Sequence, residues 1–127
     1  MAVRPDIKII SIDDFPTMRR IIKSLLKQIG FMNVLEADDG AMGLTLIKHE
    51  HPDLIISDWN MPKMNGLELL KAVRTEAGIS NTPFIMITAE AEKENIVQAV
   101  QCGVSNFIVK PFTAEVLRQK INKVFGE

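Results

Sequence analysis

The sequence of 127 residues contains no tyrosine, a single tryptophan and a single cysteine. One cysteine cannot form a disulfide within its own chain, so we expect Cys102 to serve packing alone. The apolar runs are short, as in Leu54–Ile56, whereas about 20 apolar residues are needed to cross a bilayer. Basic charge is not in excess either, because 15 Lys and Arg residues stand against 16 Asp and Glu residues. These absences exclude a disulfide-stabilised fold, a membrane span and a basic surface for nucleic acid.

Length and composition favour one ordinary globular domain that covers residues 1–127. Hydrophobic residues make up 46% and charged residues 24%, close to the globular average. A chain of this length buries roughly two-thirds of its unfolded surface, which is enough for a core of its own. The first residues, Met1–Asp6, carry charge and proline where a signal peptide needs an apolar segment. We therefore expect a cytoplasmic protein.

Five short apolar runs recur along the chain, and each is followed by a stretch with helical periodicity. The clearest helix is the first, where apolar residues recur every three or four positions until Gly30 ends it. The predicted strands are Ile7–Ile12, Val34–Ala37, Leu54–Ser57, Phe84–Thr88 and Phe107–Val109. The predicted helices are Thr17–Ile29, Gly40–Glu50, Gly66–Ala77, Lys93–Cys102 and Ala114–Phe125. Five such units use up the whole chain and leave no linker or second domain.

The apolar runs indicate a parallel sheet with helices on both faces. Ile7–Ile12 and Phe84–Ile87 are almost continuously apolar, as strands covered on both sides are. The pattern predicts a doubly wound α/β fold with right-handed crossovers. Ligands bind such sheets beyond the carboxyl ends of the strands. The chemistry should therefore lie just after each apolar run.

Polar residues stand at four of these strand ends: Asp13 and Asp14 after the first run, Asp58 after the third, Thr88 at the end of the fourth and Lys110 after the fifth. Three converging carboxylates repel one another unless a cation joins them, and an all-oxygen ligand set selects a hard ion such as Mg²⁺. Lysine and threonine suit phosphoryl oxygens. The set predicts a phosphoryl-transfer site.

Asp58 is the residue that we expect to accept the phosphoryl group. No serine, cysteine or histidine accompanies the carboxylates as an obvious nucleophile, and Asp58 stands alone at the end of the middle strand. Asp13 and Asp14 would then hold the metal, and Asn60 in the following loop offers its backbone carbonyl. Taken singly, the residues have simpler explanations: a helix cap for the aspartate pair, a strand end for Thr88 and a solvated turn for Lys110.

Taken together, these residues match a known family: the chain resembles the receiver domains of two-component response regulators, and among them the single-domain chemotaxis members. The resemblance covers essentially the whole chain. It rests on Asp13-Asp14-Phe15 with Thr17–Arg20, Ser57–Pro62, Gly66–Lys71, Thr88–Ala91 and Val109–Thr113.

The resemblance implies a flavodoxin-like (βα)5 fold with strand order 2-1-3-4-5. It implies that Asp58 accepts a phosphoryl group from a histidine kinase, with Asp13, Asp14, Asp58 and Asn60 around Mg²⁺. Thr88 and Lys110 would contact the bound phosphoryl group, and the Lys110–Pro111 peptide would be cis. Such a receiver is a phosphoprotein that assists its own phosphorylation and dephosphorylation and is no enzyme with a separate substrate. We expect a monomer, with a phosphatase as a further partner.

In the chemotaxis members the phosphorylated form controls flagellar rotation by binding the motor switch. The resemblance implies a binding face on the fourth helix, fifth strand and fifth helix. Its residues here are Ala91, Lys93, Ile96, Val100, Val104, Phe107 and Lys120.

Two positions depart from the family pattern. Phe107 stands where the chemotaxis members usually carry a tyrosine, so the ring has no hydroxyl with which to bind a partner. Asn65 replaces an aspartate before Gly66, and either residue can cap the following helix.

Phe107 leaves a second function open, in which the receiver serves as a phosphate sink or regulates a partner other than the motor. A third candidate is a phosphatase of the haloacid dehalogenase type, which also uses an aspartyl nucleophile. Its Asp-x-Asp-x-Thr signature is absent from Asp58–Pro62, which disfavours that enzyme.

Overall fold

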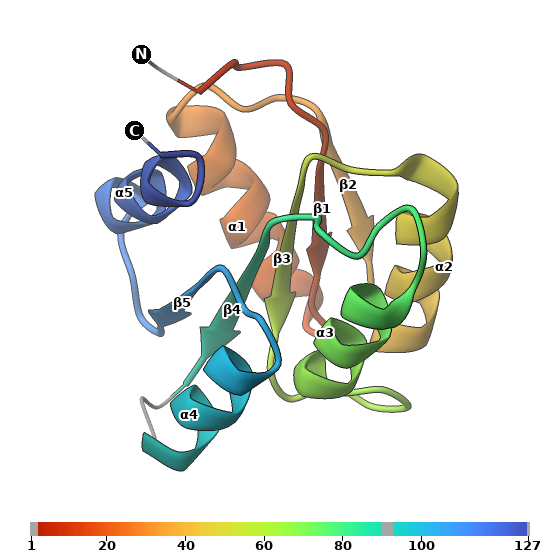
Figure 1. Ribbon diagram of the computed structural model, residues 1–127. Coiled ribbons are helices and arrows are strands. Elements are labelled where there is room, and N and C mark those ends of the chain that lie inside the picture. Colours follow the sequence, from red (N-terminus) through yellow and green to blue (C-terminus); the bar gives the residue numbers. More distant parts are fainter. Residues whose placement is uncertain (1–2, 90–92, 127) are drawn as a thin grey trace.

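The computed structural model describes residues 3–89 and 93–126, in which five strands alternate with five helices (Figure 1). The strands are β1 (Ile9–Ile12), β2 (Val34–Ala37), β3 (Leu54–Asp58), β4 (Phe84–Thr88) and β5 (Asn106–Val109). The helices are α1 (Pro16–Gln28), α2 (Gly40–Glu50), α3 (Gly66–Thr75), α4 (Lys93–Gln101) and α5 (Ala114–Val124).

The strands form one parallel sheet in the order β2-β1-β3-β4-β5, which confirms the expected order. From β1 the chain continues to β2 on one side, whereas β3, β4 and β5 follow on the other side. Strand order therefore reverses between β1 and β3, and Ile12 pairs with Ser57 at this point. Because ligands of open α/β sheets bind at this reversal, the residues just beyond Ile12 and Ser57 mark the expected site.

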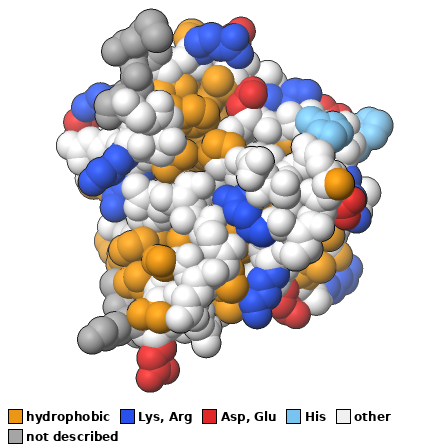
Figure 2. Space-filling model, viewed as in Figure 1, with side chains coloured by type: hydrophobic (Ala, Val, Ile, Leu, Met, Phe, Trp, Pro, Cys, Tyr) orange, Lys and Arg blue, Asp and Glu red, His pale blue; other side chains and the backbone are white. Residues whose placement is uncertain are grey.

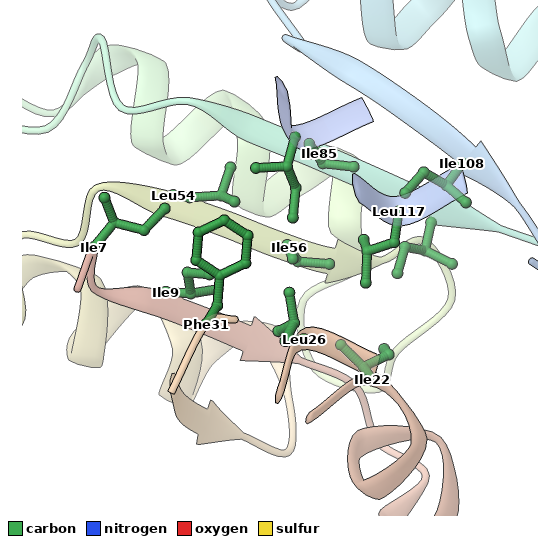
Figure 3. Close-up of a cluster of buried hydrophobic side chains, with 12 residues drawn as sticks. Ile7, Ile9, Ile22, Leu26, Phe31, Leu54, Ile56, Ile85, Ile108 and Leu117 are labelled. Carbon is green, nitrogen blue, oxygen red and sulfur yellow. The ribbon is translucent and has the colours of Figure 1, made fainter. Parts of the chain in front are cut away.

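Helices cover both faces of the sheet, and each face has its own core. Figure 3 shows the cluster between the sheet and helices α1 and α5, where Ile9 and Ile56 from the sheet meet Leu26 of α1 and Leu117 of α5. On the opposite face, residues such as Ile55 and Phe84 pack in a second cluster with α2 and α3. Burial on both faces explains why inner strands such as β1 and β4 are almost purely apolar.

Most boundaries agree with the prediction to within one or two residues, and two differences have clear causes. The strand β1 begins at Ile9 rather than Ile7, because the amide of Lys8 donates to the Asp53 carboxylate at 2.8 Å instead of joining the ladder. Helix α3 ends at Thr75 rather than Ala77, because Glu76 turns to an extended conformation.

Side-chain caps fix the starts of three helices. Asp39 accepts the Met42 amide at α2, Thr113 accepts the Val116 amide at α5, and Asn65 forms a reciprocal capping box with Glu68 at α3. This confirms that asparagine at position 65 can cap the helix as an aspartate would. In the part of the chain that the structure describes, no helix is long and apolar enough to cross a membrane.

Candidate functional site

The carboxyl ends of β1 and β3 bring the three aspartates together. Asp13 directly follows β1, Asp14 comes next, and Asp58 is the last residue of the neighbouring strand β3. One carboxylate oxygen from each of the three lies within 4.8 Å of the others. Asp13 is fully buried, Asp58 is 6% exposed and Asp14 is half-buried. The sequence thus correctly predicted which acidic residues would meet.

Asp13 carries a charge that the protein leaves partly uncompensated. Its Oδ1 accepts the Phe15 amide at 2.9 Å, whereas its buried Oδ2 has no hydrogen-bond partner among the described residues. Burial raises the pKa of the Asp13 carboxyl, and the charges of Asp58 and Asp14 raise it further, against the lowering effects of the Phe15 amide and Lys110. A buried oxygen of this kind is suited to a cation.

Lys110 and Thr88 complete the group from the other side of Asp58. The Lys110 Nζ lies 2.9 Å from Asp58 Oδ1, and the lysine side chain is only 19% exposed. Thr88 is the buried last residue of β4, and its backbone carbonyl accepts the Lys110 amide at 2.8 Å. The Lys110–Pro111 peptide is cis, as expected. The three aspartates and Lys110 therefore lie together, and Thr88 ends the strand beside β3 and is joined to Lys110 through its backbone.

The loop after β3 holds Asn60, the remaining predicted ligand, which is exposed. The loop is fixed at both ends, because the Trp59 amide donates to the Ile87 carbonyl at 2.9 Å and the Gly66 amide donates to the Trp59 carbonyl at 2.8 Å. A Cβ atom on Gly66 would lie 2.4 Å from the Asp58 carbonyl oxygen. Only glycine lets α3 approach the strand end this closely, a role that sequence inspection did not assign.

Arg19 is a second residue whose role was missed. Its Nη1 donates to the backbone carbonyl of Asp13 at 2.7 Å. The motif that contains Arg19 was part of the family resemblance, but spacing alone did not indicate that the guanidinium turns back to the preceding loop.

The expected partner-binding face exposes apolar side chains on α4. Val97 is 45% and Val100 is 62% exposed, and hydrophobic side chains gather in this region in Figure 2. Phe107 of β5 is half-buried, and the Lys120 Nζ of α5 lies 5.2 Å from its ring centroid. Ala91 and the Lys93 side chain lie outside the described residues. Helix α4 thus leaves apolar side chains outside the core.

Comparison with known proteins places these features in a family. The model of the response regulator receiver domain matches residues 9–122. Chemotaxis protein CheY of Pseudomonas aeruginosa is 50% identical over 118 residues, which cover 93% of this chain and 95% of that protein.

Two solved structures show the same fold. The chemotaxis response regulator CheY4 of Vibrio cholerae superposes with a TM-score of 0.86 at 34% identity, covering 94% of this chain and 98% of that one. A receiver domain of a sensor histidine kinase from Pseudomonas aeruginosa, solved with magnesium in its active-site cleft, gives a TM-score of 0.87 at 22% identity, covering 96% and 99%. The chain therefore belongs to the response regulator receiver domains, of the type that the chemotaxis protein CheY represents.

Proposed function

We propose that the protein accepts a phosphoryl group on Asp58 from the phosphohistidine of a chemotaxis histidine kinase and thereby changes its affinity for a partner. The observation that carries the proposal is the position of Asp58, within the cluster of three carboxylates and 2.9 Å from the Lys110 ammonium. A carboxylate in this setting is an oxygen nucleophile beside a fixed positive charge.

The residues at the strand ends fit a magnesium ion. The donor set consists of oxygen atoms alone, and the buried Oδ2 of Asp13 lacks a partner among the described residues. Asp13, Asp14 and Asp58, with the backbone carbonyl of Asn60, would hold the ion. Bound magnesium would neutralise charge that builds up on the transferring phosphoryl oxygens.

The chain's own residues would bind and orient the reacting groups. A P–O bond to Asp58 forms while the P–N bond of the donor breaks, and the leaving imidazole keeps the electron pair of that bond. The Lys110 ammonium, which pairs with Asp58 Oδ1 before the reaction, can then pair with a phosphoryl oxygen. The Thr88 hydroxyl, at the end of the next strand, can donate to another.

Acetyl phosphate tests the proposal without a kinase. With Mg²⁺, intact-mass measurement should show the gain of one phosphoryl group, and chelation of the metal with EDTA should prevent it. Hydroxylamine should remove the group, because it cleaves acyl phosphates. Absence of the mass gain would contradict the proposal, and continuous hydrolysis of p-nitrophenyl phosphate would support the phosphatase alternative. We infer that no such turnover occurs and that the protein acts as a signalling module in the cytoplasm, where the kinase would hold its phosphohistidine.

The partner that we propose is the flagellar motor switch, bound at the face formed by α4, β5 and α5. Exposed Val97 and Val100 supply apolar contact area, and the relative at 50% identity is a chemotaxis protein. The phosphoryl group would draw the Thr88 hydroxyl toward itself, and Phe107 could turn into the vacated space. Such coupling between sites typically amounts to about 1–3 kcal/mol.

Phosphorylation should tighten binding of a motor-switch peptide only modestly, because the Phe107 ring offers no hydroxyl to a partner. We expect Phe107→Tyr to tighten it further. Fluorescence anisotropy with and without beryllofluoride, a phosphoryl mimic, measures both effects. Phe125→Tyr is the matched control, because it adds the same hydroxyl to a ring that packs against the other core. Equal affinity with and without beryllofluoride would favour a phosphate sink or another partner.

A further inference from the structure

The turn that carries Asp13 and Asp14 lacks the side-chain cap that fixes the starts of α2, α3 and α5. Phe15 is the N-cap residue of α1 and provides no side-chain hydrogen bond, and the first turn of α1 contains no acidic residue. By contrast, α2, α3 and α5 are capped by Asp39, Asn65 and Thr113. Other contacts must therefore hold this turn, in which the Asp13 side chain is fully buried.

Three hydrogen bonds hold Asp13: one at its amide, one at its carboxylate and one at its backbone carbonyl. Its amide donates to the Ala37 carbonyl of β2 at 3.2 Å, and its Oδ1 accepts the Phe15 amide at 2.9 Å. Its carbonyl accepts Arg19 Nη1 at 2.7 Å, the shortest of the three and the only one whose other partner is a side chain. The Arg19 amide in turn donates to the Phe15 carbonyl at 3.0 Å, so one residue is bonded to both ends of the turn.

The Arg19 side chain lies beside an open pocket and is no part of either hydrophobic core. A cavity of about 240 Å³ lies beside it, lined by Arg19, Glu36, Ala37, Asp38 and Met42. The Arg19 side chain is half-buried. Replacing the guanidinium should therefore release the turn without emptying a core position.

We propose that Arg19 is a positioning residue for the metal-binding carboxylates: it holds the main chain of Asp13 so that the bare Oδ2 stays within the ligand cluster. This inference rests on the proposed function, because it assigns Arg19 to the same phosphoryl-transfer site. Arg19 touches no reacting group, and it acts through the Asp13 carbonyl.

Charge and hydrogen bonding predict effects of opposite sign, which makes the proposal testable. If Arg19 acted only as a nearby positive charge, its removal would strengthen the binding of a cation. If it acts by holding the turn, its removal weakens binding, because the carboxylates lose their arrangement. Arg20 is the matched control: it carries the same charge on the same helix, is exposed, and belongs to the opposite, outward groove lined by Thr17, Ile21, Ser24 and Leu25.

The test compares Arg19→Met with Arg20→Met, each of which removes one positive charge and keeps an unbranched apolar stem. Mg²⁺ binding is followed by the fluorescence of Trp59, the single tryptophan, which adjoins Asp58. We expect the dissociation constant to rise about three- to tenfold in Arg19→Met, which corresponds to the net contribution of one typical intramolecular hydrogen bond. In Arg20→Met it should stay unchanged or fall. An unchanged or lower constant in Arg19→Met would overturn the proposal.

Amide hydrogen exchange in metal-free protein supplies a readout that does not depend on metal or phosphorylation. The Phe15 amide, which donates to Asp13 Oδ1, should exchange faster in Arg19→Met and at the wild-type rate in Arg20→Met. Equal rates in all three proteins would refute the positioning role. If wild-type protein gave no fluorescence response to Mg²⁺, the metal proposal would fail, and exchange alone would still decide the role of Arg19.

Discussion

Asp58→Asn is expected to abolish phosphoryl incorporation from acetyl phosphate. The substitution replaces the carboxylate by a neutral amide of nearly the same shape, which has no charged oxygen to attack phosphorus. It also removes the ion pair with Lys110, which now joins the two side chains at 2.9 Å. Intact-mass measurement after incubation with acetyl phosphate and Mg²⁺ should show only the unmodified mass.

Asp39→Asn is the matched control for this experiment. Asp39 also lies beyond the carboxyl end of a strand and also pairs with a lysine, because Lys63 Nζ is 3.5 Å from its Oδ2. It lies outside the carboxylate cluster found among the described residues, and asparagine can still cap α2. This variant should gain one phosphoryl group like the wild type. Full labelling of Asp58→Asn would show that another residue accepts the phosphoryl group.

The fold and the strand-end residues were predictable because they follow from patterns that are local in sequence. Continuous apolar runs such as Leu54–Ser57 indicate buried parallel strands, and the residue after each run must lie at the carboxyl edge. The ends of β1 and β3 are neighbours only if strand order reverses between these two strands. That strand order was predicted from the family resemblance. Convergence of Asp13 with Asp58 therefore needed both sources.

Contacts between distant segments escaped prediction, since no periodicity encodes them. The Arg74 guanidinium, half-buried at the end of α3, donates through Nε to the Gly103 carbonyl at 2.9 Å and through Nη1 to the Thr82 carbonyl at 2.6 Å. Burial lowers the pKa of the Arg74 guanidinium. From the sequence alone, Arg74 is indistinguishable from a solvated arginine on a helix.

The start of β1 shows how such a contact shifts a boundary. Ile7 is apolar and continues the run in the sequence, and in the structure it is buried like a strand residue, with 4% exposure. The carboxylate of Asp53, 45 residues further along the chain, binds the Lys8 amide and replaces the strand partner. A side chain outside the run thus decides where the ladder begins.

Asp13→Asn is expected to stabilise the metal-free protein while removing its response to Mg²⁺. The substitution removes a fully buried charge whose Oδ2 lacks a partner among the described residues. Removal of the charge relieves its burial cost and its repulsion by Asp58 and Asp14, so the midpoint of thermal unfolding should rise by roughly 3–10 °C without metal. Added Mg²⁺ should stabilise the wild type by mass action and leave the variant nearly unchanged.

The sign of the pH dependence gives this prediction a second check. Because burial raises the pKa of Asp13 in the folded protein above the ordinary 3.8, the native state binds its proton more tightly than the unfolded chain does. Ionisation of this group therefore costs stability as the pH rises through the raised pKa, and that cost is absent below 3.8. The advantage of Asp13→Asn should be largest at neutral pH and shrink as the solution is acidified.

Comparing the variant with the wild type also removes the contribution to stability of other groups that titrate in the same pH range. The Met42 amide, above all, lowers the pKa of Asp39, so its contribution to stability is lost as the pH falls, equally in both proteins. Thermal unfolding in EDTA at several pH values, with the wild type alongside, isolates Asp13. A variant less stable than the wild type at neutral pH would show that the Asp13 carboxylate is compensated in the folded protein. Its burial could then no longer be taken as the strain that a cation relieves at this site.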